Sequence, residues 1–279
     1  MNLSLVVLVI YQVEVTSAKN DFICSFQYVT YNFVQRYSCV IDFVRNFDDA
    51  VETTIGGTHQ SGRSDDDVVY LRIINCNIPR ILTEFFTQFP NLQILHIVNG
   101  GLREIQVNAF NGANNIQTVE FSSNDLRVIN EHSFNGLPSL NWLQLDGNNV
   151  VHVNENAFTS LEQLSVLLLD FNPITSLPPT VFYPLTGLHI ISLSHLLLTT
   201  IDGRLFAKNI NLDTISLENN EISAIESTFL DNVNFRNLDM TGNKCINQNF
   251  RLVAMLREEV FIKLNVCFSN FLQTTNLMS

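Results

Sequence analysis

The chain has 279 residues, of which 46% are hydrophobic and 15% are charged, and this composition predicts a folded protein with a large apolar interior. Its formal net charge of −12 argues against nucleic acid as a partner, because binding to phosphates requires a basic surface. The same negative charge argues against electrostatic docking on anionic lipid.

Residues 1–18, MNLSLVVLVIYQVEVTSA, have the features of a secretory signal peptide. The apolar run Leu5–Ile10 is too short to span a bilayer, and Thr16-Ser17-Ala18 offers small residues for cleavage. A buried N-terminal strand is the alternative interpretation. No later segment has the length of a transmembrane helix, so we expect a secreted, extracellular protein without membrane insertion, in which disulfides can form.

Residues 19–67 precede a repetitive region and contain Cys24 and Cys39. The segments Phe22–Thr30 and Tyr37–Phe43 alternate between apolar and polar residues well enough to be paired strands. A disulfide between Cys24 and Cys39 across these strands is the simplest interpretation.

A repeat of 24 residues follows, with leucine-like residues at relative positions 1, 4, 6, 11 and 14. The repeats start at Val68, Leu92, Ile116, Leu140, Leu164, Leu188, Leu212 and Phe235. An asparagine column occupies relative position 9, as Asn124, Asn148, Asn172, Asn220 and Asn243. A phenylalanine column recurs with the same period, from Phe86 to Phe229. Because no single repeat can bury its own apolar face, the repeats must stack.

This pattern resembles the leucine-rich repeat family in its 24-residue extracellular form, and 140-LNWLQLDGNNVVHVNENAFTSLEQ-163 fits that form nearly throughout. The resemblance implies an α/β-type repeat solenoid, a curved horseshoe with a parallel β-sheet on its concave face and disulfide-bonded caps. The N-terminal cap is then residues 19–67, the eight repeats are residues 68–244, and a reduced C-terminal cap and tail are residues 245–279. Side chains at positions 4 and 6 point into the core, whereas those at positions 3, 5 and 7 point outward from the sheet.

The asparagine column is expected to bond backbone groups of adjoining turns that would otherwise be buried without a partner. Cys76, Gly100 and Leu196 break the column. Cysteine is a common substitute there in the resembled family, which makes Cys76 the expected buried, reduced thiol. Leu196 cannot make the bonds of an amide, and this predicts a weak point or an altered turn across residues 192–200.

The C-terminal part resembles a shortened leucine-rich-repeat cap. The cap of the family carries four cysteines and a tryptophan, whereas only Cys245 and Cys267 remain here, and the resemblance implies one disulfide between them. One face of an expected helix is formed by Phe250, Val253, Leu256 and Val260. The reduced cap and the Cys24/Cys39 segment are also similar to secreted insect leucine-rich-repeat proteins, some of which act in innate immunity.

Catalysis and metal binding find little support in the sequence. Ser192 lies in one repeat with His189 and His195, and Asp170 and Asp213 lie in neighbouring repeats. A Ser/His/Asp site needs a fixed hydrogen-bonded chain and an oxyanion hole, which an open sheet face does not obviously supply. No His/Cys spacing suggests zinc. We therefore expect no enzyme activity and no cofactor.

The expected concave face carries an apolar patch with an acidic rim. The apolar residues are Trp142, Val166, Leu168 and Ile190, the acidic residues are Glu120, Asp146, Asp170 and Glu218, and Gln144 lies beside them. Such a patch marks an interaction site, and tryptophan is enriched among binding hot spots. We predict a recognition protein that binds a protein or peptide ligand with a basic surface on this face.

Three alternatives remain open for this face. The patch is covered by a loop of the protein itself, or it joins two copies of an adhesion protein in a concave-to-concave homodimer. Asp146 and Asp170, which occupy position 7 of adjacent repeats, either hold a calcium ion or are solvated carboxylates that face a basic partner. The N-terminal cap is a candidate to cover the apolar residues at the start of the face, which are Tyr70, Ile74, Ile94 and Val98.

Overall fold

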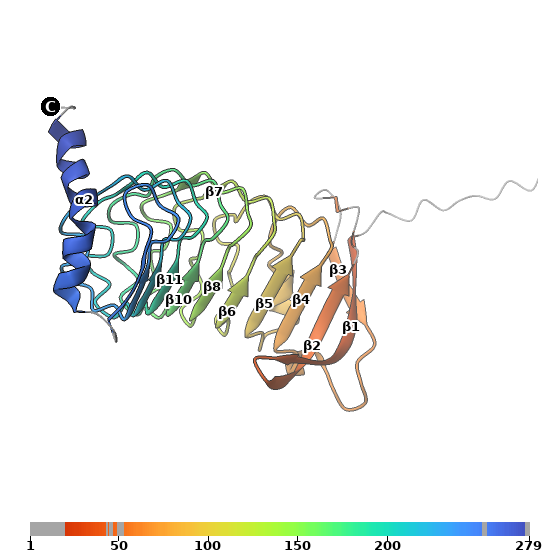
Figure 1. The fold of residues 1–279 in the computed structure, drawn as a ribbon. Coiled ribbons are helices and arrows are strands. Elements are labelled where there is room, and N and C mark those ends of the chain that lie inside the picture. Colours follow the sequence, from red (N-terminus) through yellow and green to blue (C-terminus); the bar gives the residue numbers. More distant parts are fainter. Residues whose placement is uncertain (1–19, 43, 45–46, 49–52, 253–255, 277–279) are drawn as a thin grey trace, which may run out of the picture.

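The computed structural model describes residues 20–42, 44, 47–48, 53–252 and 256–276. The expected signal peptide, residues 1–18, lies outside them. The described chain is a solenoid with short parallel strands along one side and a long helix across its C-terminal end (Figure 1).

One sheet runs through the whole solenoid. Its repeat strands are β4 (Tyr70–Ile74), β5 (Ile94–Val98), β6 (Thr118–Glu120), β8 (Trp142–Gln144), β10 (Val166–Leu168), β11 (Ile190–Ser192), β13 (Thr214–Ser216) and β15 (Asn237–Asp239). Adjacent strands are parallel and pair at the same repeat position, so that Trp142 lies opposite both Thr118 and Val166. This confirms the predicted parallel-sheet repeat solenoid and the register that divides core positions from outward ones.

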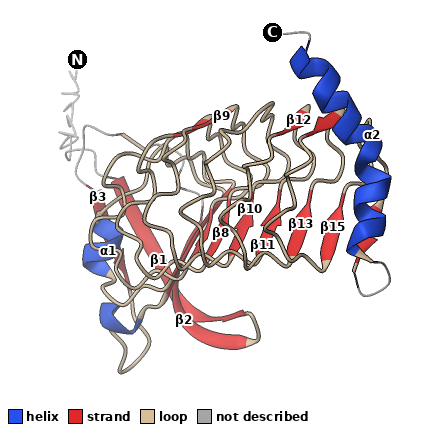
Figure 2. Ribbon diagram, turned by 90° about the vertical axis from the view of Figure 1, so that its left-hand side faces the viewer, coloured by secondary structure: helices blue, strands red, loops and turns tan. Residues whose placement is uncertain are grey.

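The core is continuous because side chains of the same type stack from repeat to repeat. Leu143, Leu145 and their equivalents are fully buried between the sheet and the opposite side of the solenoid. The phenylalanine column fills that opposite side, and the ring centroids of Phe134 and Phe158 lie 5.9 Å apart. Short strand pairs lie there, as Figure 2 shows for β9 and β12; the pairs are β7 (Val128–Ile129) with β9 (His152–Val153) and β12 (Thr200–Ile201) with β14 (Ala224–Ile225).

The asparagine column bonds the backbone of neighbouring turns, as expected. The amide nitrogen of Asn148 donates to the carbonyls of Phe121 at 2.8 Å and Leu145 at 2.9 Å. Its amide oxygen accepts the N–H of Leu126 at 3.2 Å. The same arrangement recurs at Asn124, Asn172, Asn220 and Asn243. Each amide therefore joins two successive repeats inside the core.

Leu196 is expected to alter the turn at residues 192–200, but the altered hydrogen bond lies one repeat earlier, at residues 172–174. Leu196 is buried, with 2% of its surface exposed. Without an amide at this position, the N–H of Ile174 bonds to the backbone carbonyl of Asn172 at 2.9 Å and so closes a tighter local turn. The expected departure thus falls at residues 172–174, around Pro173.

The N-terminal cap extends the repeat sheet. Strands β1 (Asn20–Tyr31) and β2 (Val34–Asp42) form an antiparallel hairpin that the Cys24–Cys39 disulfide closes, and β2 pairs in parallel with β4. Strand β3 (Thr53–Gly57) adds to β1, and the short helices η1 (Asp65–Asp67) and α1 (Glu84–Gln88) follow. The tip of the hairpin bends beneath β4 and β5 in Figure 1. The apolar end of the first repeat is thereby covered.

The C-terminal cap contains the predicted helix, but the helix begins later in the sequence than predicted. Helix α2 (Arg257–Asn276) starts after Phe250, which lies in β16 (Asn249–Arg251). Strand β16 pairs antiparallel with β15, the last repeat strand, and so supplies hydrogen-bond partners to the edge of β15 that faces away from the other repeats. This pairing holds Phe250 in an extended conformation. Val260 is buried as expected and Leu256 is exposed, whereas Val253 lies outside the described residues.

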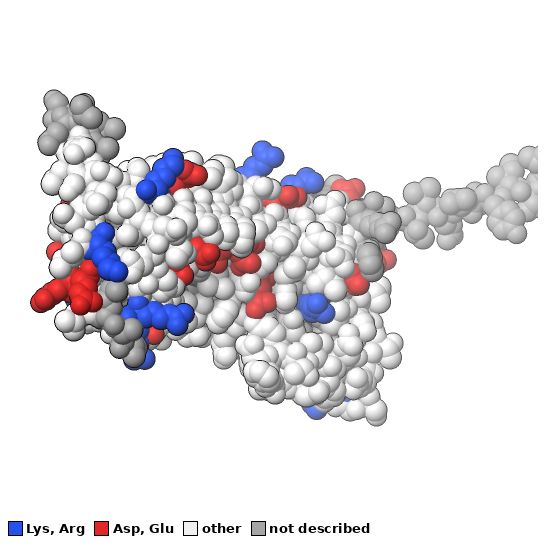
Figure 3. Space-filling view, in the orientation of Figure 1, with Lys and Arg blue, Asp and Glu red and all other residues white. Residues whose placement is uncertain are grey.

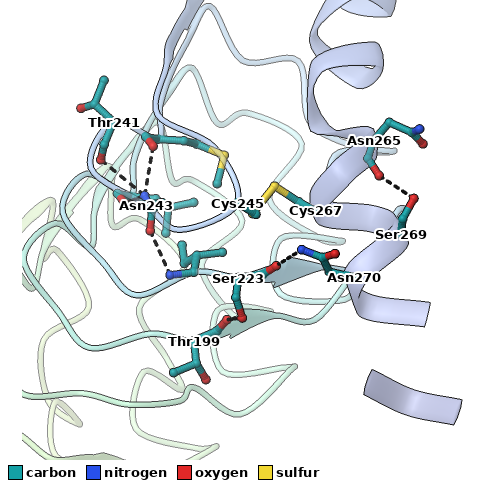
Figure 4. Close-up of a disulfide and its surroundings, with 12 residues drawn as sticks. Thr199, Ser223, Thr241, Asn243, Cys245, Asn265, Cys267, Ser269 and Asn270 are labelled. Atoms are coloured by element: carbon teal, nitrogen blue, oxygen red, sulfur yellow. Dashed lines mark hydrogen bonds between the residues drawn. A yellow bond between two sulfur atoms is a disulfide. The ribbon is translucent and has the colours of Figure 1, made fainter. Parts of the chain in front are cut away.

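The cysteines follow the expected pairing. Cys245 and Cys267 join the end of the repeats to α2, with their Cα atoms 5.3 Å apart (Figure 4). Asn270 of α2 donates a hydrogen bond to the Ser223 carbonyl at 2.8 Å on the same side (Figure 4). Cys76 is buried outside both disulfides, and its sulfur accepts the N–H of Val44 at 3.3 Å.

Candidate ligand-binding face

We define the sheet face as the side chains at relative positions 3, 5 and 7 of the repeats. Trp142, Val166 and Ile190 lie side by side on it, because their strands pair in register. Ile190 is 38% exposed, and Trp142 and Leu168 are partly buried and less exposed than Ile190. Val166 is only 7% exposed, so it supports its neighbours and offers little surface to a ligand. The apolar patch is therefore narrower than the sequence indicated.

Glu120 is engaged by the N-terminal cap and does not form an open rim. The Tyr31 hydroxyl, at the end of β1, donates to one oxygen of the Glu120 carboxyl group. The other oxygen lies 3.1 Å from Nδ1 of His96, which is 2.9 Å from the Tyr70 hydroxyl. Burial raises the pKa of Glu120, and the charge of Asp146 adds to this effect.

The cap also covers the start of the sheet face. Tyr70 and Ile94 are 2% and 3% exposed, and the Tyr31 ring packs on that of Tyr70 at 5.4 Å. Burial, with a smaller effect of Arg72, lowers the pKa of His96 to about 4, so its ring is neutral at pH 7. The cap thus covers Tyr70 and Ile94, whereas Ile74 and Val98 at position 7 of the same two repeats stay partly exposed.

Asp170 accepts two hydrogen bonds, one from a side-chain hydroxyl and one from a backbone N–H. The Ser192 hydroxyl and the Ser194 backbone N–H both donate to its Oδ1 at 2.6 Å. Burial raises the pKa of Asp170, these bonds oppose the rise, and Asp146 adds to it. Because the Ser192 proton points to a carboxylate and not to a histidine, the geometry is not that of a Ser/His/Asp site.

Asp146 and Glu218 complete the acidic side chains of this region. One oxygen of Asp146 is buried and has no hydrogen-bond partner among the described residues. Glu218 accepts the amide of Asn219 at 2.8 Å. Gln144 accepts the indole N–H of Trp142 at 3.4 Å, which keeps the ring against the sheet. Figure 3 shows acidic side chains over the middle of the molecule, in the view of Figure 1.

Two exposed rings next to the sheet face do not belong to the predicted site. Phe171 lies three residues after the end of β10 and is 58% exposed. Its ring stacks on that of His195, with centroids 4.2 Å apart and planes 11° from parallel. The sequence does carry a signal for Phe171, since position 8 otherwise holds mainly small or polar residues such as Asn99, Ser123 and Asn219.

Metal-binding clusters and membrane-spanning helices are absent from the described residues. Within that part of the chain, no three His, Cys, Asp or Glu side chains are grouped so that they could hold a metal ion. No helix among the same residues combines the length and apolar character needed to cross a bilayer.

Comparisons with known proteins support the leucine-rich repeat assignment. The leucine rich repeat family model matches residues 90–150, 143–195 and 162–217. The structure is similar to a chain in the crystal structure of a TLR13–ssRNA13 complex, with a TM-score of 0.61 and 21% sequence identity over 70% of this chain and 29% of that chain. A search of curated proteins gave no match. The chain therefore folds as a leucine-rich repeat solenoid, and it spans less than a third of the length of this structural relative.

Proposed function

We propose that this protein is a secreted, non-catalytic recognition protein that binds a protein or peptide ligand with a basic surface on its sheet face. The observation that carries the proposal is the accessible group of Trp142, Leu168 and Ile190 on three successive strands beside Asp146, Asp170 and Glu218. Partly exposed apolar side chains supply contact energy, and carboxylates around them speed the encounter with a basic partner.

Secretion and a role in innate immunity are parts of the same proposal. Two disulfides fit an oxidising, extracellular environment. Leucine-rich repeat solenoids host many functions, so the fold alone does not assign immunity. Support for that role comes from the structural likeness to TLR13 and from the resemblance to secreted insect proteins.

RNA is the competing ligand class, because the TLR13 chain was crystallised in complex with ssRNA13. On the present chain, a net charge of −12 and the carboxylates of the sheet face disfavour binding of phosphates. Fluorescence anisotropy with a labelled single-stranded RNA and with a labelled basic peptide, each at two salt concentrations, separates the two ligand classes.

The proposal is tested by crosslinking pull-down from extracellular fluid, with wild type compared to Trp142→Asp. Val107→Asp is a matched control, because Val107 is 67% exposed in a turn away from the sheet face. We expect Trp142→Asp to lose partners that Val107→Asp retains. Equal recovery of every partner by all three proteins would refute the proposal.

Self-association through the sheet face is the alternative function. Analytical ultracentrifugation distinguishes it, because a homodimer that Trp142→Asp dissociates and Val107→Asp preserves supports an adhesion role.

A further inference from the structure

One backbone position at the edge of the sheet has the left-handed conformation in every repeat. These position-8 residues, with φ between 50° and 71°, are Asn75, Asn99, Ser123, Gly147, Phe171, His195, Asn219 and Gly242. Glycine and asparagine adopt this conformation at low cost, whereas a bulky side chain is strained there. Phe171 is the residue of this column that fits its backbone least well.

Stability of the fold does not explain Phe171. Its ring is 58% exposed, so burial contributes little, and its contact is the stacked ring of His195. His195 is in turn positioned by Asn219, whose amide nitrogen lies 3.3 Å from Nε2. A strained residue that presents a supported aromatic ring to solvent is typical of a binding site.

One face of the Phe171 ring stacks on His195 of the next repeat, so the other face is directed toward the preceding repeat, where position 8 is Gly147. The backbone bonds continue beyond the strands, from Ser123 N–H to the Asp146 carbonyl at 3.0 Å and from Gly147 N–H to the Asp170 carbonyl at 2.9 Å. Ser123, Gly147 and Phe171 are therefore consecutive, each about 4.8 Å from the next. Gly147 has no side chain, so residue 147 leaves the space between the Ser123 side chain and the Phe171 ring unfilled; a Cβ there would lie 3.4 Å from Ser123 Oγ. We call this space the slot.

The negative charge of the carboxylates beside this slot favours a planar group that is positively charged. Asp146 directly precedes Gly147 and is partly exposed, although one of its carboxylate oxygens is buried without a hydrogen-bond partner among the described residues. Asp170 occupies the same repeat position on the adjacent repeat and so contributes a second negative charge near the first. A guanidinium group suits this place, because it stacks flat on an aromatic ring and donates charge-assisted hydrogen bonds to an accessible carboxylate oxygen.

We propose that Phe171, Gly147 and Asp146 form a slot for an arginine side chain of the ligand. The inference rests on the proposed function and specifies the ligand chemistry beside the apolar patch. Lysine fits less well because its ammonium group is not planar, and a neutral planar group lacks attraction to the carboxylates.

Three pentapeptides test the chemistry, namely Gly-Gly-X-Gly-Gly with arginine, lysine or citrulline at X, titrated by NMR. We expect the arginine peptide to bind wild type roughly fivefold or more tightly than either of the others. Equal affinities, or no saturable shift with any peptide up to about 10 mM, a concentration at which a contact worth about 3 kcal/mol is detected, would overturn the proposal.

Two variants close or remove the slot. Gly147→Asn fills it with the residue that occupies the same left-handed position at Asn99, and Phe171→Asn removes the ring. Phe33→Asn is a matched control, because Phe33 is a fully exposed phenylalanine with φ of 64° at the hairpin tip. We expect both slot variants to lose the preference for arginine and Phe33→Asn to retain it. Retention by either folded slot variant would contradict the slot.

The same variants separate this inference from the proposed function. A pull-down partner that Trp142→Asp loses, but that both Gly147→Asn and Phe171→Asn retain in full, overturns the arginine slot and leaves ligand binding on the sheet face intact. A partner set that Trp142→Asp retains overturns the proposed function itself.

Discussion

Replacement of Asn148 by leucine is expected to destabilise the solenoid, because the buried amide makes its shortest bonds to three backbone groups and a longer one, at 3.5 Å, to the Asp146 carbonyl. Its oxygen accepts the Leu126 N–H, and its nitrogen donates to the carbonyls of Phe121 and Leu145. Both carbonyls keep a second amide donor, from Asn124 and Asn172 respectively. The Leu126 N–H, in contrast, loses the partner that it has in the column.

The magnitude follows from this difference. One buried, unpaired N–H costs about 1–3 kcal/mol, and two lost bonds to carbonyls that remain bonded cost about 0.5–1 kcal/mol each. Added burial of the leucine side chain offsets part of the total. We therefore expect Asn148→Leu to lower the free energy of unfolding by about 2–4 kcal/mol.

Urea denaturation measures the loss, and amide hydrogen exchange locates it in the repeats on both sides of residue 148. Asn149→Leu is the matched control, since Asn149 is exposed and its amide makes only a 3.4 Å contact with Asp125. A loss below about 1 kcal/mol, or equal losses in the two variants, would refute the reasoning about the column.

Three further predictions concern the two caps. Burial raises the pKa of Glu120 above 4.5, so its contribution to stability is present below that pH and is lost as pH rises through the folded pKa. The free energy of unfolding of wild type relative to Glu120→Gln, from urea titrations, should therefore fall as the pH is raised from 4.5 through the folded pKa, and a constant difference would contradict it. Tyr31→Phe removes the hydroxyl that bonds Glu120 and should speed hydrogen exchange at the tip of the β1–β2 hairpin while the repeats stay unchanged; wild-type exchange there would show that the bond does not hold the hairpin. Replacement of Cys245 and Cys267 by serine opens a link of 22 residues and should cost about 3 kcal/mol, with faster exchange in α2; unaltered exchange in α2 would argue against a stabilising role of the disulfide.

The sequence was sufficient to predict the register of the sheet. In a strand the side chains alternate between two faces, so a leucine pattern at positions 4 and 6 leaves no choice for Trp142 at position 3. Stacking of identical repeats then carries that assignment from Tyr70 to Asn237. The outward direction of Trp142 follows from local pattern and repetition alone.

Exposure on that face could not be predicted in the same way, because it depends on neighbours outside each repeat. Val166 is buried between Trp142 and Ile190, although its own position is an outward one. Glu120 is covered by Tyr31, a residue 89 positions away whose location depends on how the hairpin bends. The repeat pattern contains no information on either contact.

Leu196→Asn is the reverse of the first substitution, and the structure predicts a small effect. The Ile174 N–H that an amide at position 196 would serve is already bonded to the Asn172 carbonyl. The carbonyls of Leu169 and Leu193 likewise keep one amide donor each, from Asn172 and Asn220. The leucine therefore leaves these three groups with partners.

Restoring the asparagine offers second bonds to two carbonyls but removes a buried leucine side chain, which contributes about 1.5–3 kcal/mol. These effects oppose each other, so we expect a change in the free energy of unfolding of less than about 1 kcal/mol by urea denaturation. Stabilisation of more than about 2 kcal/mol would show that Leu196 does leave buried groups unsatisfied and that the tight turn at residues 172–174 is a strained substitute. A small change, beside a large loss in Asn148→Leu, would show that the column is needed wherever the backbone has not rearranged around its absence.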